Sequence, residues 1–104
     1  MEKPKFITGS VFTTSSIATE MEKIPLFSIL CQDFLNRHRK GDWGDLVQED
    51  KELNEEALLS DGRLLSSYNL NEEMKSKISS NDVKVYIITE WDRSATTILF
   101  PSEY

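Results

Sequence analysis

The chain has 104 residues, a formal net charge of −6, 38% hydrophobic residues and 29% charged residues. A chain of this length is expected to form one domain, residues 1–104, and to bury a single core without disulfides. The acidity argues against a general nucleic-acid binder, because contact with phosphates needs a basic surface. It is compatible with binding to a basic protein surface, with imitation of nucleic acid, or with solubility alone.

The sequence carries no sign of a membrane or secreted protein. Its longest apolar runs, such as residues 85–88, are far too short to span a bilayer. Residues 1–4 lack the apolar core of a signal peptide, and the single cysteine, Cys31, has no partner for an internal disulfide. We therefore expect a cytoplasmic protein without membrane contact.

The first part of the chain predicts one strand and two helices. Residues 5–14 are rich in β-branched and aromatic side chains and predict a strand, in which Gly9 suggests a bulge. Residues 16–23 predict a short helix. Residues 25–39 predict the strongest helix, because apolar residues recur at three- and four-residue spacing and Pro25 suits the first helical position.

Residues 41–46, Gly-Asp-Trp-Gly-Asp-Leu, form a corner between this helix and the next. Gly41 suits the left-handed position after a helix, and the preceding turn is rich in cations that complement the helix dipole. Asp42 or Asp45 can cap a third helix, which is expected to end at about Ser60. That helix is more polar than the second, so we expect it to lie half exposed.

After Gly62 the hydrophobic period changes to two, which is typical of strands. Strands are predicted at residues 63–68, 83–91 and 96–100. Residues 92–94 form a hairpin, and residues 69–82 predict a long polar loop with at most a helical turn. The expected fold is α+β: an N-terminal strand, two or three helices, then a three-stranded antiparallel meander with helices packed on one face.

Common catalytic motifs find little support. The glycines of the corner do not follow a strand and lack the Lys-Ser/Thr pair of a phosphate-binding loop. One cysteine and one histidine cannot supply a zinc site. Cys31 and His38 lie about 10 Å apart on one helix, so a buried, inert cysteine and a histidine that complements the dipole are favoured over a nucleophile–base pair.

Carboxylates from two regions could meet if the corner approaches the end of the strand at residues 83–91. Such a cluster could hold Mg²⁺ for phosphoryl chemistry. Capping and solvation explain each acidic residue separately, so we expect no metal and no cofactor. The carboxylates concerned are Asp42, Asp45, Glu49, Asp50, Glu90 and Asp92.

The two tryptophans mark a more plausible site, because each lies in a turn or at a strand end beside an aspartate. Tryptophan and arginine are enriched at interface hot spots. Arg93 could instead pair with Asp42 or Asp45 and pin the corner as pure architecture, with Trp43 folded back on the sheet. Both interpretations stay open. The residues expected to contact a partner are Asp42, Trp43, Asp45, Glu49, Asp50, Trp91, Asp92 and Arg93.

Motifs spread over residues 24–104 form one pattern. Its main parts are Gly41-Asp42-Trp43-Gly44-Asp45-Leu46, Glu49-Asp50-Lys51, Arg63-Leu64-Leu65-Ser66-Ser67-Tyr68, Tyr86-Ile87-Ile88-Thr89-Glu90-Trp91-Asp92-Arg93-Ser94 and Pro101-Ser102-Glu103-Tyr104. The pattern resembles a family of small uncharacterised proteins encoded on bacterial plasmids, integrative elements and phages. The loop at residues 71–82 is longer here than in that family.

The resemblance implies a way of life more than an activity, since small acidic proteins of mobile elements often protect the element from host defence. We expect an anti-defence protein, most concretely a non-enzymatic, anti-CRISPR-type inhibitor that binds a host effector nuclease (Cas9-like). One alternative is a small metal-dependent nuclease or hydrolase that uses Asp42, Asp45, Glu90 and Asp92. Another is a homo-oligomeric accessory protein of the element.

Overall fold

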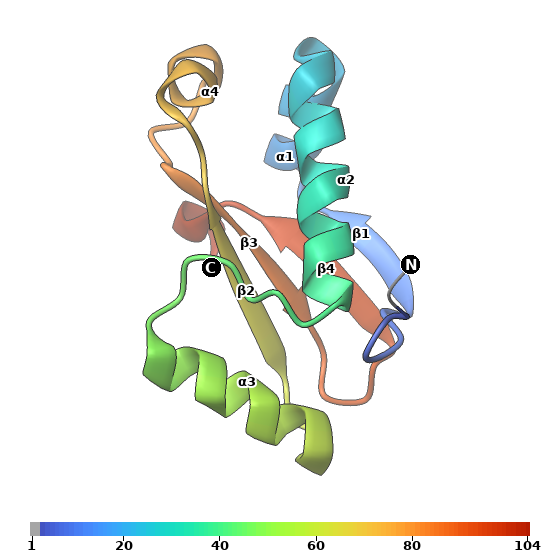
Figure 1. Cartoon of the computed structure of the whole chain (residues 1–104). Helices are drawn as coiled ribbons and strands as arrows, with labels where there is room; N and C mark the ends of the chain where they lie inside the picture. Colours follow the sequence, from blue (N-terminus) through green and yellow to red (C-terminus); the bar gives the residue numbers. More distant parts are fainter. Residues whose placement is uncertain (1–2) are drawn as a thin grey trace.

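A four-stranded mixed sheet forms the centre of the protein in this computed structural model, which describes residues 3–104 (Figure 1). The strands are β1 (Ser10–Thr13), β2 (Leu64–Asn69), β3 (Lys84–Thr89) and β4 (Ala95–Leu99), in the order β1-β4-β3-β2. The α+β class is confirmed. The sheet differs from the predicted three-stranded meander, because β1 adds a fourth strand that lies parallel to β4 while the other pairs are antiparallel.

The helices are α1 (Ser15–Lys23), α2 (Pro25–Arg39), α3 (Gln48–Ser60), α4 (Glu72–Lys77) and the 3₁₀ helix η1 (Pro101–Glu103). In Figure 1, α1 and α2 lie together on one side of the sheet, and α3 lies at the end nearest β2. No helix among residues 3–104 is long and apolar enough to cross a membrane.

β1 is shorter than the predicted strand at residues 5–14, since residues before Ser10 have another role. The amide of Lys5 donates to the carbonyl of Arg39 at the end of α2 (2.8 Å), which draws this segment away from the sheet. Gly9 then has φ of +62°, and a Cβ placed there would lie 2.2 Å from the carbonyl oxygen of Ser94. Only glycine allows the chain to turn into β1 so close to the β3–β4 hairpin.

The segment predicted as a loop at residues 69–82 contains α4. Its first turn is capped by Asn71, whose side chain accepts from the amide of Met74 at 2.8 Å. Met74 and Ile78 are buried in the main core. Burial of this pair at helical spacing explains why a polar segment folds into a short helix.

The main core lies between α1, α2 and one face of the sheet. Phe34 of α2 stacks on Tyr68 of β2 with ring centroids 4.7 Å apart, and Phe27 stacks on Phe100 at 6.0 Å. The same core includes Ile17, Cys31, Leu35, Val85, Ile87 and Ile98. Burial raises the pKa of the Cys31 thiol to about 12, so Cys31 is an inert core residue at neutral pH.

A network of hydrogen-bonded, buried polar side chains crosses the protein at the C-terminal end of α2. His38 Nδ1 lies 2.5 Å from Ser66 Oγ, and its Nε2 lies 2.9 Å from Thr89 Oγ1. Thr89 Oγ1 lies 2.7 Å from Thr96 Oγ1. Thr96 in turn donates to the carbonyl of Thr8 at 2.8 Å. The network therefore joins α2, three strands and the segment before β1.

The carbonyl of Thr8 can only accept, so it fixes which atom donates in each hydrogen bond of this network. Because Thr96 donates to a carbonyl, it must accept from Thr89, and Thr89 must accept from Nε2–H of His38. Nδ1 is then the acceptor for Ser66. His38 is thus held neutral as one tautomer, and burial lowers its pKa to about 3.

This arrangement predicts a loss of stability in mild acid. The unfolded state takes up a proton below the ordinary histidine pKa of 6.5, whereas the folded state does so only near its lowered pKa of about 3. When the pH falls from 7 to 5, the protonation of His38 in the unfolded state should therefore lower the free energy of unfolding by about 2 kcal/mol. Urea unfolding at both pH values measures the change, and His38→Gln should remove most of it. An equal pH dependence in the variant would contradict this assignment.

Candidate functional site

The corner at residues 41–46 lies against β2. Gly44 pairs with Ser67 in a parallel bridge. Asp45 N donates to Ser67 O at 2.6 Å, and Ser67 N donates to Trp43 O at 3.2 Å. Gly44 has φ of +77°, and a Cβ there would lie 2.0 Å from Ser67 O. The glycine is therefore required by direct backbone contact between the corner and the strand.

The two aspartates of the corner complete this attachment. Asp42 pairs with Arg37 (2.7 Å) and also accepts from the amide of Gly44 (3.1 Å). The bond from Arg37 is the main cause that holds the pKa of Asp42 below its usual value. The backbone carbonyl of Asp42 accepts from the Tyr68 hydroxyl at 2.6 Å, and the side chain of Asp45 accepts from the amide of Asn69 at 2.8 Å.

The predicted capping of α3 by Asp42 or Asp45 is therefore wrong. Both side chains bind other groups, and the residue at the N-cap position is Val47, which makes no side-chain cap. Glu49 and Asp50 lie in the first turn, where their charge complements the positive end of the helix dipole. The helix depends on these charges and on its packing.

Trp43 is buried, with only 4% of its surface exposed. Its ring lies in a small second core with Ala57 and Leu64, and Phe6 stacks on it at 6.2 Å. The indole Nε1 donates to Glu55 of α3 at 2.8 Å. This side chain therefore joins the corner, α3 and the segment before β1, and it is not exposed to a partner.

Arg93 does not pair with Asp42 or Asp45, contrary to the prediction. Its guanidinium donates to the carbonyls of Gly62 (2.5 Å) and Ala57 (3.0 Å), at the C-terminal end of α3. The last turn of α3 contains no basic residue of its own. The β3–β4 hairpin thus supplies the cation that the negative end of this helix favours.

Trp91 and Asp92 are exposed at the hairpin, and 64% of the Trp91 surface is open. Asp92 accepts from the amide and the hydroxyl of Ser94, at 3.1 and 2.7 Å, and these bonds lower its pKa. The hairpin lies beside the C-terminal end of α3 (Figure 1). Trp91 and Asp92 are therefore available to a partner, while Trp43 and Arg93 support the surface from within.

The exposed surface of α3 is acidic and partly apolar. Its exposed carboxylates are Glu49, Asp50, Glu52, Glu55 and Glu56. Leu53 and Leu59 on the same helix are 60% and 91% exposed. Lys51 is the one basic residue of this helix. We call this surface, formed by residues 49–59 of α3, the acidic face.

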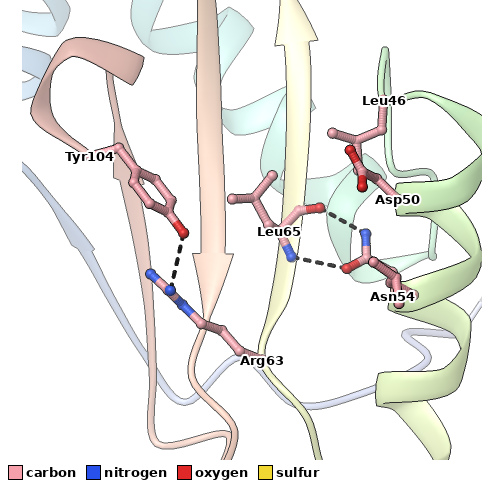
Figure 2. A pocket seen from close by; sticks show the side chains of 7 residues that line it. Leu46, Asp50, Asn54, Arg63, Leu65 and Tyr104 are labelled. Atoms are coloured by element: carbon pink, nitrogen blue, oxygen red, sulfur yellow. Dashed lines mark hydrogen bonds between the residues drawn. The ribbon is translucent and has the colours of Figure 1, made fainter.

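A groove separates α3 from the outer face of β2 (Figure 2). Asn54 fixes its base, because its side chain donates to Leu65 O (2.7 Å) and accepts from Leu65 N (3.1 Å). Asp50 lies on the α3 side, and Arg63 with Tyr104 lies opposite. The cavity holds about 310 Å³ and also contacts Leu46 and Leu53.

The sequence indicated only part of this groove. Asp50 is among the expected contact residues, whereas the sequence predicts Arg63 and Leu65 as part of a strand and indicates Tyr104 only as part of the family-like pattern. The alternation of Arg63 and Leu65 along one strand face was an available signal. No such signal marks the position of Tyr104, because this position depends on how η1 directs the chain after β4.

The carboxylates named for a Mg²⁺ site do not come together. Asp42, Asp45 and Asp92 bind groups within their own surroundings. Within residues 3–104, no group of three or more histidine, cysteine, aspartate or glutamate side chains is arranged to hold a metal ion.

Comparisons with known proteins leave this surface to be interpreted from its own chemistry. No protein-family model matches the chain, and no significant match is found among curated proteins or solved structures.

Removal of the Arg93 guanidinium should destabilise the protein. Arg93→Ala leaves the carbonyls of Ala57 and Gly62 without their charged donor, so the free energy of unfolding should fall by about 2 kcal/mol. Arg93→Lys should cost less, because one ammonium can reach only one of the two carbonyls well. Urea unfolding measures both, with Lys3→Ala as an exposed control. An Arg93→Ala protein as stable as the control would contradict the capping role.

The two tryptophans should differ strongly in access to solvent. In Trp91→Phe the remaining Trp43 should fluoresce at short wavelength and resist acrylamide, since it is 4% exposed. In Trp43→Phe the remaining Trp91, 64% exposed, should be quenched several-fold more strongly. Similar quenching constants for the two variants would show that Trp43 is not held in the second core.

Proposed function

We propose that this protein is an anti-defence protein of a mobile genetic element, and that it inhibits a host CRISPR effector nuclease, Cas9-like in the most concrete case. In this proposal it acts by binding, without catalysis of its own. The acidic face of α3 is the surface that would contact the nuclease, with Trp91 and Asp92 of the adjacent hairpin. The single observation that supports this most is the density of exposed carboxylates on α3.

That density approaches the charge density of nucleic acid. Five exposed carboxylates lie between Glu49 and Glu56, a span of seven residue steps. At a rise of about 1.5 Å per residue the span is about 10 Å, and with Lys51 counted the net charge is −4, or one negative charge about every 2.6 Å. Duplex DNA carries one phosphate charge about every 1.7 Å of its axis. A channel lined by lysine and arginine for nucleic acid would therefore attract this helix.

The acidic face is also held rigidly. The Trp43–Glu55 hydrogen bond ties the middle of α3 to the corner, and Arg93 binds its C-terminal end. Binding then costs little ordering of the helix, which favours affinity. The exposed Leu53 and Leu59 supply apolar contact within the charged surface.

The proposal predicts inhibition that depends on the charge of α3. The purified protein should reduce DNA cleavage by at least one member of a panel of CRISPR effector nucleases, with a strong decrease at high salt. Charge reversal in Glu49→Lys/Glu52→Lys/Glu56→Lys should weaken inhibition at least tenfold.

A matched control reverses three exposed acids elsewhere, Glu22→Lys/Asp33→Lys/Glu72→Lys, and carries the same change in net charge. It should retain most of the inhibition. An equal loss in both triple variants would assign the effect to net charge alone. Absence of inhibition and of binding across the whole panel would contradict the proposed function.

A further inference from the structure

The groove between α3 and β2 combines an apolar floor with separated charges. Leu46, Leu53 and Leu65 contribute the apolar surface, and 60% of Leu53 is exposed. Tyr104, which is 63% exposed, forms the far wall. Apolar groups that remain open beside a concave polar rim are typical of a site that receives a side chain of another molecule.

The charges of the groove are not neutralised by each other. The Arg63 guanidinium lies 5.3 Å from the centre of the Tyr104 ring and donates to the Tyr104 hydroxyl at 3.2 Å. This contact holds Arg63 on the far wall (Figure 2). Across the groove, Asp50 makes no ion pair with any residue in the described part of the chain. Asp50 therefore remains as an acceptor at the rim, beside the exposed Glu49.

This chemistry selects among occupants. Arg63 on the far wall would attract a phosphate-bearing molecule, but Asp50 and the other carboxylates of α3 would repel it, and it would meet an apolar floor. A protein segment in which an aliphatic side chain lies beside a lysine or arginine satisfies both parts. Its cation would pair with Asp50, and its aliphatic group would cover Leu53 and Leu65.

We propose that this groove is the specificity pocket of the protein and binds an aliphatic side chain flanked by a basic residue, both from one exposed segment of the partner protein. The inference deepens the proposed function, because it gives the acidic face a site that recognises a particular partner. The acidic face attracts basic surfaces in general, and the groove selects among them.

Three capped tripeptides test the chemistry of the groove without any nuclease. The probe is acetyl-Leu-Arg-Leu-amide, and the controls are acetyl-Leu-Glu-Leu-amide and acetyl-Ser-Arg-Ser-amide. Titration into the ¹⁵N-labelled protein should shift the amide resonances of Leu53, Asn54 and Leu65 with the first peptide. The affinities of the other two should be at least about fivefold weaker.

Variants of α3 place the binding within the groove. Asp50→Asn and Leu53→Ser should each weaken binding of the Leu-Arg-Leu peptide about fivefold. Asp33→Asn and Leu26→Ser change the same residue types at exposed positions of α2, outside both the groove and the acidic face, and they should leave the affinity unchanged. Equal binding of the Glu and Arg peptides, or shifts confined to other parts of the protein, would overturn the inference. So would shifts at the groove that grow with protein concentration alone, because these would identify a second copy as the occupant.

The failure of this inference can be told apart from the failure of the proposed function. A nuclease inhibited equally well by the native protein, Asp50→Asn and Leu53→Ser would leave the function standing and reject the groove. Selective binding of the Leu-Arg-Leu peptide, with no nuclease of the panel inhibited, would support the groove and reject the function.

Discussion

The direct backbone contact between Gly44 and Ser67 is the constraint on which the rest of this end of the protein depends. It brings the corner so close to β2 that no side chain fits between them. The next two residues of β2 also bind the corner, because the Tyr68 hydroxyl donates to the carbonyl of Asp42 and the amide of Asn69 donates to the side chain of Asp45. Because α3 begins only a few residues later, its distance from the sheet is set here, and the groove is the space that remains.

The proposed function depends on the way this attachment presents α3. The helix contacts the sheet through Asn54 and through Ala57, which shares the second core with Leu64, and it is held further by the corner, Trp43 and Arg93. Trp43 is buried and Arg93 is bound to backbone carbonyls, which leaves the acidic face and the groove open to solvent. The corner is thus the support of the proposed binding surface. Of the residues predicted to contact a partner, Trp43 is buried and Arg93 is half-buried, whereas the other six are exposed.

Local patterns predicted most helices and strands, and non-local pairing accounts for what they missed. The apolar spacing of α2 and the alternation in β3 were sufficient for both elements. The parallel pairing of β1 with β4 depends on residues far apart in the chain, as does the binding of Arg93 to the carbonyls of Ala57 and Gly62. His38 looked like a dipole-compensating residue, yet its role depends on Ser66 and Thr89, which come from two later strands.

Amide hydrogen exchange of Asp45 and Ser67 tests the central claim most directly. Both amides donate within the bridge between the corner and β2, at 2.6 and 3.2 Å. If the corner is fixed architecture, both should exchange as slowly as the amides of the β2–β3 ladder, and they should be released together with them in denaturant. Exchange of Asp45 at the rate of an unfolded peptide, while β2 stays protected, would show that the corner moves freely and that α3 is not held in place by it.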